Sequence, residues 1–184
     1  MGHARRVKPG RSLLWSMLVF AICVAGYPNP GLADVSVGIF IVDGVRYQNI
    51  GQAYADCTNL SGNYHYTRCE IWDYNLVNGE AMNSLPWDPN GGSGYTPFDL
   101  HLGPGTLKIC DSSGGICGSS GFTFVIPRLS RVTGAGRTSS LAGGTVIQAG
   151  NLFTANPKTL VQVGDADSTA SFGSVLSNVT VDCN

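Results

Sequence analysis

Short apolar runs separated by glycine-rich or polar turns fill the last third of the chain. The last three runs begin at Thr145, Leu160 and Val175, which lie fifteen residues apart. Five runs rich in β-branched residues make up the pattern: FTFVI (122–126), LSRV (129–132), TVIQ (145–148), LVQV (160–163) and VLSNVTVDC (175–183). Short strands at near-regular spacing predict an all-β coil or barrel rather than a helical or alternating α/β protein.

The alternation of residues in the last run predicts which of its side chains are buried. Successive side chains of a strand point to opposite faces. One face of this run then carries Val175, Val179, Val181 and Cys183. We therefore expect Cys183 to be buried.

A strand followed by a short helix is predicted where the globular part begins. DVSVGIFIV (34–42) alternates small or polar residues with apolar ones, which is typical of a strand, and Asp43-Gly44 indicates a turn. Asn49 has the character of a helix N-cap, with Gln52 at the capping-box spacing. The apolar face of the predicted helix consists of Ile50, Ala53, Tyr54 and Cys57.

Residues 58–104 have the least regular pattern and are rich in aromatic side chains. Seven aromatic residues lie in thirty-five positions from Tyr64 to Phe98. One strand is predicted around residues 68–74, and the next over TLKIC (106–110). We therefore expect 58–104 to be an irregular, aromatic-rich insertion.

The first 33 residues have the pattern of a secretory signal. Four basic residues precede the apolar run LLWSMLVFAICVA (13–25), and a turn-rich segment with small residues follows. The alternative is a membrane anchor, but the run is shorter than the ~20 apolar residues that a spanning helix needs. We expect residues 1–33 to be removed, leaving one domain over 34–184 that is secreted, extracellular or periplasmic, and not attached to a membrane.

Removal of this segment changes the charge of the chain. Seven Lys and Arg then face twelve Asp and Glu, a net charge of about −5. A net-negative domain without a basic run is a poor binder of nucleic acid or of an anionic membrane. Both are excluded as expected partners.

Five cysteines remain after residue 33, and neighbours in sequence are the simplest pairs. Cys57 with Cys69 and Cys110 with Cys117 would each close a polar loop in an oxidising compartment. Cys183 is then left over. Either a missing partner or burial would account for it.

No complete set of catalytic or metal-binding residues can be found in the sequence. Asp165 and Asp167 could approach the separation that glycoside hydrolysis needs, but GDADST (164–169) also has the composition of an ordinary polar turn. Zinc binding by Cys57, His65 and Cys69 would lack a fourth ligand. The catalytic residues therefore stay unknown, and no metal or cofactor is expected.

VDGVRYQNIGQAYADC (42–57) resembles the entry segment of right-handed parallel β-helix proteins of the pectate-lyase-like superfamily. In these proteins a short strand and a capping helix begin the solenoid. The segments that resemble the following coils are GPGTLKI (103–109), IPRLSRVTGAGR (126–137), GGTVIQAG (143–150) and LSNVTVDCN (176–184). The resemblance covers most of residues 40–184. It implies a mainly β solenoid with an N-terminal capping helix, and it is more specific for fold than for activity.

The resemblance also bears on completeness. Solenoid coils bury their faces on their neighbours, so about three coils are needed and the ends need caps. The predicted strands suffice for about two coils, and no capping helix follows them. We expect the N-terminal part of a longer protein whose catalytic coils are absent, with an open coil edge that favours self-association.

The family includes polysaccharide lyases, glycoside hydrolases and non-catalytic surface proteins, so the resemblance implies a carbohydrate-associated function. We expect part of a polysaccharide lyase or hydrolase without a complete active site in this chain. The alternative is a non-catalytic β-solenoid module for adhesion or surface structure. Whether the chain is an enzyme stays open at this point.

Four aromatic residues are the candidates for binding a polysaccharide: Trp72, Tyr74, Trp87 and Tyr95. Flat rings stack on sugar faces, and exposed aromatic patches tend to mark interaction sites. The alternative is that Trp72 and Trp87 close one end of the fold, since large apolar side chains are generally buried.

Overall fold

The computed structural model describes residues 36–59, 66–91, 95–111, 123–137, 143–153, 159–166 and 172–183. The predicted signal segment, 1–33, lies outside these ranges. Among the residues that the structure describes, no helix is both long enough and apolar enough to cross a membrane.

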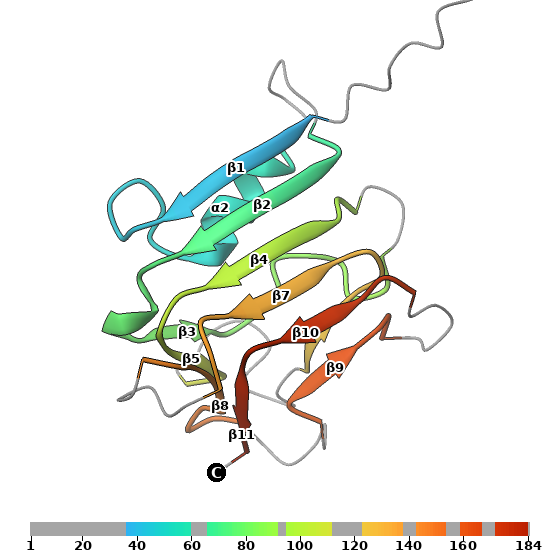
Figure 1. The fold of residues 1–184 in the computed structure, drawn as a ribbon. Coiled ribbons are helices and arrows are strands. Elements are labelled where there is room, and N and C mark those ends of the chain that lie inside the picture. Colours follow the sequence, from blue (N-terminus) through green and yellow to red (C-terminus); the bar gives the residue numbers. More distant parts are fainter. Residues whose placement is uncertain are drawn as a thin grey trace, which may run out of the picture. The chain divides into compact units, whose positions relative to one another are not determined.

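The fold is mainly β, and every strand pair described is parallel (Figure 1). Sheet A has the order β1 (Val37–Val42), β2 (Arg68–Asp73), β4 (Phe98–Leu102), β7 (Arg131–Gly134), β10 (Val175–Ser177). Sheet B has the order β11 (Thr180–Asp182), β8 (Thr145–Ala149), β5 (Gly105–Ile109), β3 (Glu80–Met82). Sheet C contains β6 (Phe124–Ile126) and β9 (Val161–Val163). The parallel pairing rules out an antiparallel sandwich for the described strands.

The chain visits the three sheets in a fixed order. From β4 onward, successive strands belong to sheets A, B, C, A, B, C, A and B. Paired strands are therefore distant in sequence: Asp99 pairs with Arg131, and Arg131 with Val175. The fifteen-residue spacing of Thr145, Leu160 and Val175 is thus the step from one sheet to the next, and not the distance between paired strands.

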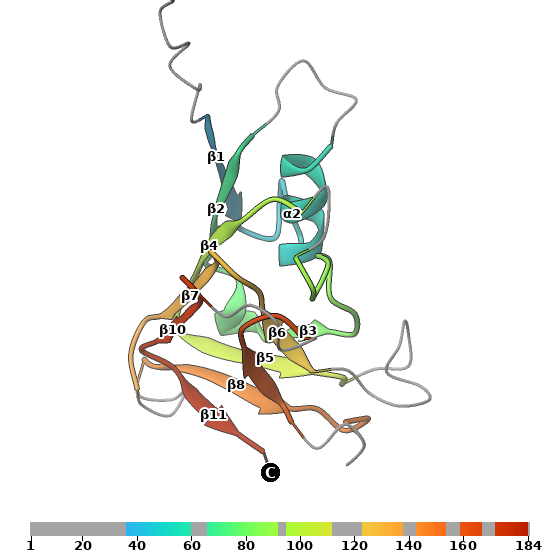
Figure 2. The ribbon, with the colours of Figure 1, turned by 90° about the vertical axis from the view of Figure 1, so that its right-hand side faces the viewer.

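The predicted helix is confirmed as α2 (Ile50–Cys57). The Asn49 side chain accepts a hydrogen bond from the Gln52 N–H at 2.9 Å, which caps the helix as predicted. Its four predicted apolar residues are all buried, and the helix packs against β1 and β2 (Figure 2). A disulfide between Cys57 and Cys69 confirms the first predicted pair and ties the end of α2 to β2.

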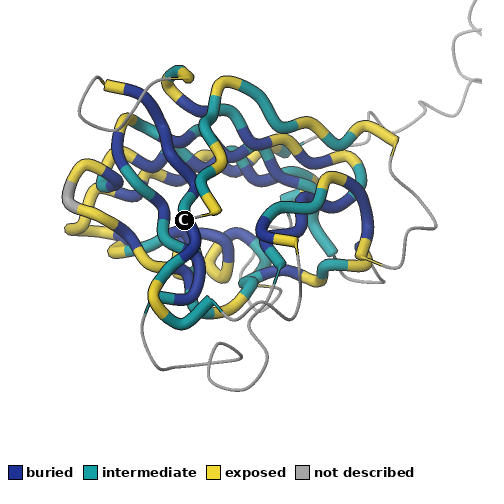
Figure 3. The backbone as a smooth tube through the Cα atoms, turned by 90° about the horizontal axis from the view of Figure 1, so that it is seen from below, coloured by how far each residue is buried: buried dark blue, intermediate teal, exposed yellow. Residues whose placement is uncertain are grey.

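Burial alternates along the strands of sheet A, as Figure 3 shows for the backbone. In β1, β2 and β4 every second side chain is buried and its neighbours are partly or fully exposed. The inward residues include Phe40, Ile71, Phe98, Leu100 and Val132, all in one core cluster. Burial of such side chains stabilises by about 1.5–3 kcal/mol each. The inner face of sheet A is therefore the main wall of the core.

Residues 58–104 contain more regular structure than the sequence indicates. Besides the predicted strand β2, the described part holds a 3-10 helix, η1 (Leu76–Asn78), and the strands β3 and β4. β4 lies between β2 and β7 in the middle of sheet A. The sequence FDLHL (98–102) alternates as a strand should, but the surrounding turn residues mask the signal.

The prediction that Cys183 is buried is wrong, because its thiol is exposed. The predicted single run is broken at Asn178, whose φ of 55° is left-handed. The break sends β10 to sheet A and β11 to sheet B, so one alternation does not extend across both strands. Val175 and Val181 are exposed as well, at 38% and 42%.

Candidate functional site

Polar and aromatic side chains cover the outer face of three neighbouring strands, β2, β4 and β7. Residues at the same register of parallel strands form rows across a sheet, and strands lie about 4.8 Å apart. The charged row consists of Glu70, Asp99 and Arg131. The second row contains two aromatic side chains and a hydroxyl: Trp72, His101 and Thr133. Because the core lies on the other face, packing does not require these residue types here.

Asp99 is the centre of the charged row. Its two oxygens accept hydrogen bonds of 2.6 and 2.5 Å from Nε and Nη2 of Arg68, a bidentate geometry that fixes both side chains. The Nε atom of Arg131 lies 4.0 Å from the same carboxylate. Arg68 also donates to the Leu129 carbonyl at 3.1 Å. The hydrogen bond with Asp99 raises the pKa of the Arg68 guanidinium above its usual value.

Three aromatic side chains on this face, Trp72, His101 and Tyr74, stack on one another, and we call this ring stack the platform. The rings of Trp72 and His101 stack with centroids 3.9 Å apart and planes inclined by only 10°. Tyr74 lies against the same indole, with a centroid distance of 6.2 Å and planes inclined by 21°. The indole N–H of Trp72 donates to Glu70 at 2.9 Å, which holds the ring in place. Tyr74 is 57% exposed, so part of the platform faces solvent.

A hollow of about 300 Å³ lies beside this platform. Its lining consists of Trp72, Tyr74, His101, Leu102, Gly103, Pro104, Thr133, Gly134 and Ala135. Small residues leave room next to the rings. Gly103 lies close to the backbone of Asp73, and an added Cβ would lie only 2.8 Å from the Asp73 carbonyl oxygen. The Thr133 hydroxyl accepts a hydrogen bond from Ser177 at 3.2 Å. The hollow thus combines aromatic rings with the Tyr74 and Thr133 hydroxyls and the His101 ring nitrogens.

The structure brings together two of the four predicted sugar-binding residues and separates the other two. Trp72 and Tyr74 share the platform. Trp87 is 4% exposed, its indole N–H donates to the Val125 carbonyl at 2.9 Å, and its ring packs on Phe98. Trp87 is therefore a buried core residue, as the alternative interpretation of the sequence expects, and it is not part of the site.

Tyr95 also has a structural role. Its hydroxyl contacts the Ser130 hydroxyl and donates to the Arg128 carbonyl at 3.3 Å. Burial raises the pKa of Tyr95 well above its usual range. The Ser130 hydroxyl also accepts the Phe98 N–H, so these groups anchor the start of β4.

Sequence reasoning missed the polar members of the site, namely Glu70, Asp99, His101 and Arg131. The outward positions of RCEIWD (68–73) and FDLHL (98–102) do alternate with apolar ones. That alternation could have assigned each residue to an outer face. The register that makes Glu70 and Asp99 neighbours is not visible in one sequence.

Those of the other sequence candidates that the structure describes have structural contacts. Asp165 is 2% exposed and accepts the Arg128 N–H at 2.8 Å, a structural contact between loops. Asp167, His65 and Cys117 lie outside the described residues. The disulfide removes Cys57 and Cys69 from consideration as zinc ligands. Cys110 is disulfide-bonded. Within the described ranges, no group of three or more acidic, histidine or cysteine side chains could hold a metal ion.

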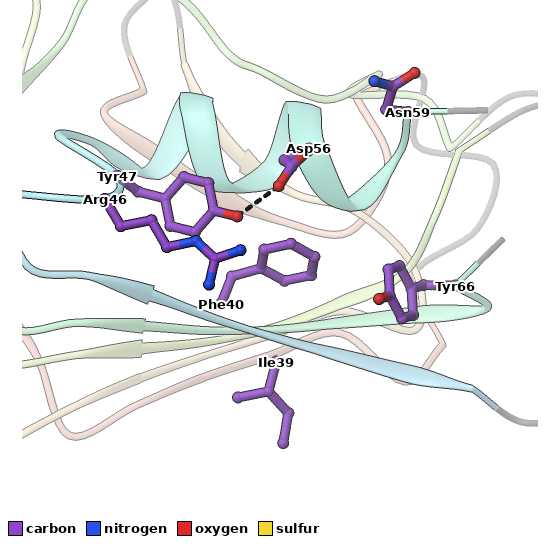
Figure 4. A pocket seen from close by; sticks show the side chains of 7 residues that line it. All are labelled: Ile39, Phe40, Arg46, Tyr47, Asp56, Asn59 and Tyr66. Carbon is purple, nitrogen blue, oxygen red and sulfur yellow. Dashed lines mark hydrogen bonds between the residues drawn. The ribbon is translucent and has the colours of Figure 1, made fainter. Parts of the chain in front are cut away.

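A second pocket, of about 240 Å³, lies between β1 and α2 (Figure 4). The Tyr47 hydroxyl donates to Asp56 at 2.5 Å, and the Arg46 guanidinium lies 5.4 Å from the centre of the Tyr47 ring. Burial and the neighbouring carboxylate raise the pKa of Tyr47. The Tyr47 side chain of this pocket is thus already engaged by Asp56 and Arg46. The platform on sheet A remains the better candidate.

Two carboxyl groups are buried on the inner side of the fold. Asp73, at the end of β2, is fully buried, and Glu80, at the start of β3, is 8% exposed. Glu80 accepts the Ile50 N–H at 3.0 Å and Asp73 accepts the Asn75 N–H at 2.8 Å. The second oxygen of each group, Oδ2 of Asp73 and Oε2 of Glu80, has no hydrogen-bond partner. Burial raises the pKa of both, that of Glu80 to about 8.

Comparison with protein-family models, with curated proteins and with solved structures finds no match for this chain.

Proposed function

We propose that the chain is a secreted, carbohydrate-associated protein with a right-handed parallel β-helix fold, and that it binds glycan on the outer face of sheet A. The observation that carries the binding proposal is the stacked platform of Trp72, His101 and Tyr74. The fold part of the proposal is supported by three parallel sheets that the chain visits in turn. Connections between parallel strands are right-handed in nearly all proteins, which supports the handedness.

A ring stack of this kind offers its exposed outer ring, Tyr74, and the edges of the inner rings to a ligand with flat apolar faces. Trp72 and His101 lie on adjacent central strands, where a small polar residue would satisfy the sheet equally well. Aromatic rings provide a large contact area at a low cost in side-chain entropy. The C–H faces of pyranose rings match such a surface, and sugar hydroxyls can bond to neighbouring polar groups. Glycan binding therefore explains both the rings and the hollow beside them.

Cleavage of the bound glycan is the second candidate function, and one observation favours it. Glu70 and Asp99 occupy the same register on adjacent strands, a spacing compatible with the roughly 5–5.5 Å between the carboxyl groups of retaining glycosidases. Asp99, however, is bonded twice to Arg68, which occupies the oxygens that would attack a sugar. This pairing favours the non-catalytic alternative, a β-solenoid module for adhesion or surface structure.

Affinity electrophoresis and calorimetry of the purified chain with soluble polysaccharides test the binding proposal. We expect Trp72→Ala to weaken binding at least tenfold, because the platform loses its central ring. Val37→Ala is the matched control: it lies on the outer face of the same sheet, 41% exposed and four residues before the register of Trp72, and should leave the affinity unchanged. Equal affinity of wild type and Trp72→Ala would contradict the proposal.

An assay for new reducing ends or unsaturated products separates the two classes of function. Release of products by the wild type and their loss in Glu70→Gln would establish an enzyme. Binding without products supports the module for adhesion or surface structure.

A further inference from the structure

We propose that the glycan bound beside Trp72 is neutral, and that an acidic polysaccharide is not the preferred ligand. This inference rests on the proposed function and adds the chemical class of the ligand. Three observations carry it: the lining of the hollow, the pairing of charges on the outer face of sheet A, and the net charge of the domain.

The lining of the hollow carries no Asp, Glu, Lys or Arg side chain. Its polar side-chain groups are the Tyr74 and Thr133 hydroxyls, the His101 ring and the Trp72 indole N–H, which is already bonded to Glu70. A carboxylate or sulfate that enters such a site loses water without gaining a counter-charge, which is costly. A sugar hydroxyl loses less and is satisfied by a single hydroxyl or ring nitrogen. The lining therefore favours uncharged sugar rings.

The charges next to the hollow are already balanced. Arg68 and Arg131 face Asp99, and Glu70 accepts the Trp72 N–H and lies 3.7 Å from the His101 ring. This face thus holds two guanidinium groups and two carboxylates. A site that binds a polyanion presents an excess of cations, and Arg68 cannot turn to a ligand without giving up its two bonds to Asp99.

The net charge of the whole domain also disfavours an acidic ligand. Residues 34–184 contain twelve acidic and seven basic residues. At low ionic strength this net negative charge repels a polyanion before contact. A neutral glycan experiences no such repulsion, so its affinity should depend little on salt.

Calorimetry with two sets of hexasaccharides tests the inference. The neutral set contains hexamers of glucose, xylose, mannose and galactose, and the acidic set contains hexamers of galacturonate and mannuronate. We expect the tightest ligand to be neutral, with an affinity at least tenfold above that of either acidic hexamer. We also expect its affinity to change less than twofold between 50 and 500 mM salt.

Variants connect the result to the hollow. Thr133→Val keeps the shape of the side chain and removes its hydroxyl, so it should weaken binding of the neutral ligand about three- to tenfold. Circular dichroism checks that the variant is folded, and Ser177→Ala, which removes only the hydrogen bond to Thr133, controls for local structure.

Two outcomes would overturn the inference, and they differ in meaning. A tightest ligand that is acidic, weakens with salt and is lost in Arg131→Ala would refute neutrality while leaving glycan binding intact. Absence of binding by every hexamer, or binding that Trp72→Ala leaves unchanged, would refute the proposed function itself.

Discussion

Successive side chains of β2, β4 and β7 point alternately to the two faces of sheet A, and the two faces differ in composition. Inward positions such as Ile71 and Leu100 are fully or almost fully buried and aliphatic, as the core requires. The adjacent outward positions hold Trp72 and His101, which no core packing demands. By contrast, the outward positions of β1 in the same sheet are plain aliphatics, 41–65% exposed. The composition of the inner face therefore follows from stability, and the central outer face is where we propose that a ligand binds.

Truncation of an inward residue should give the largest loss of stability. Leu100→Ala removes a side chain that is 1% exposed and leaves a cavity in the core, so we expect a loss of about 2–5 kcal/mol in the free energy of unfolding. His101→Ala changes the next residue on the outer face and should cost about 1 kcal/mol or less. Urea unfolding of both variants measures the difference, and equal losses would show that the outer face also carries the fold.

The buried carboxyl pair makes the inner side sensitive to pH. The pKa of Glu80, about 8, lies above its usual value of 4.5, so between these values the folded state holds a proton that the unfolded state has lost. The stabilising contribution is complete below pH 4.5 and is lost as the pH rises through about 8. The slope is about 1.4 kcal/mol per pH unit for one proton.

Glu80→Gln tests this dependence. Glutamine keeps an acceptor for the Ile50 N–H and a permanent donor toward Asp73, so it imitates the protonated acid. We expect the melting temperature of the wild type to fall from pH 5 to pH 8, and that of the variant to fall less. Glu70→Gln, on the outer face of β2, is the control. A wild-type profile that is flat over this range would mean that the pair shares no proton.

Local signals in the sequence predict part of this arrangement. The strand–turn–helix start, the Asn49 cap and the Cys57–Cys69 disulfide follow from spacing alone, and the structure confirms them. Two of the three platform rings are predicted from the sequence, because Trp72 and Tyr74 lie two residues apart, the first near the end of β2 and the second just after it. Their partner His101 arrives through parallel pairing with a strand about thirty residues later. Such register depends on the length of the intervening loops, which periodicity does not encode.

The smallest effect is expected from the ion pair that borders the platform. Arg68 and Asp99 are 28% and 25% exposed, so water screens much of their attraction, and exposed pairs contribute about 0.2–1 kcal/mol. Arg68→Ala should therefore lower the free energy of unfolding by about 1 kcal/mol or less, well below the loss for Leu100→Ala. The same variant frees the Asp99 carboxylate beside Glu70, and Arg68→Lys keeps one charge without the fork. Thermal unfolding at 50 and 500 mM salt measures the pair, since salt should reduce the gap between wild type and Arg68→Ala. A loss above about 3 kcal/mol would place Arg68 among the groups that hold the fold, and the distinction between the two faces would then not apply to this strand.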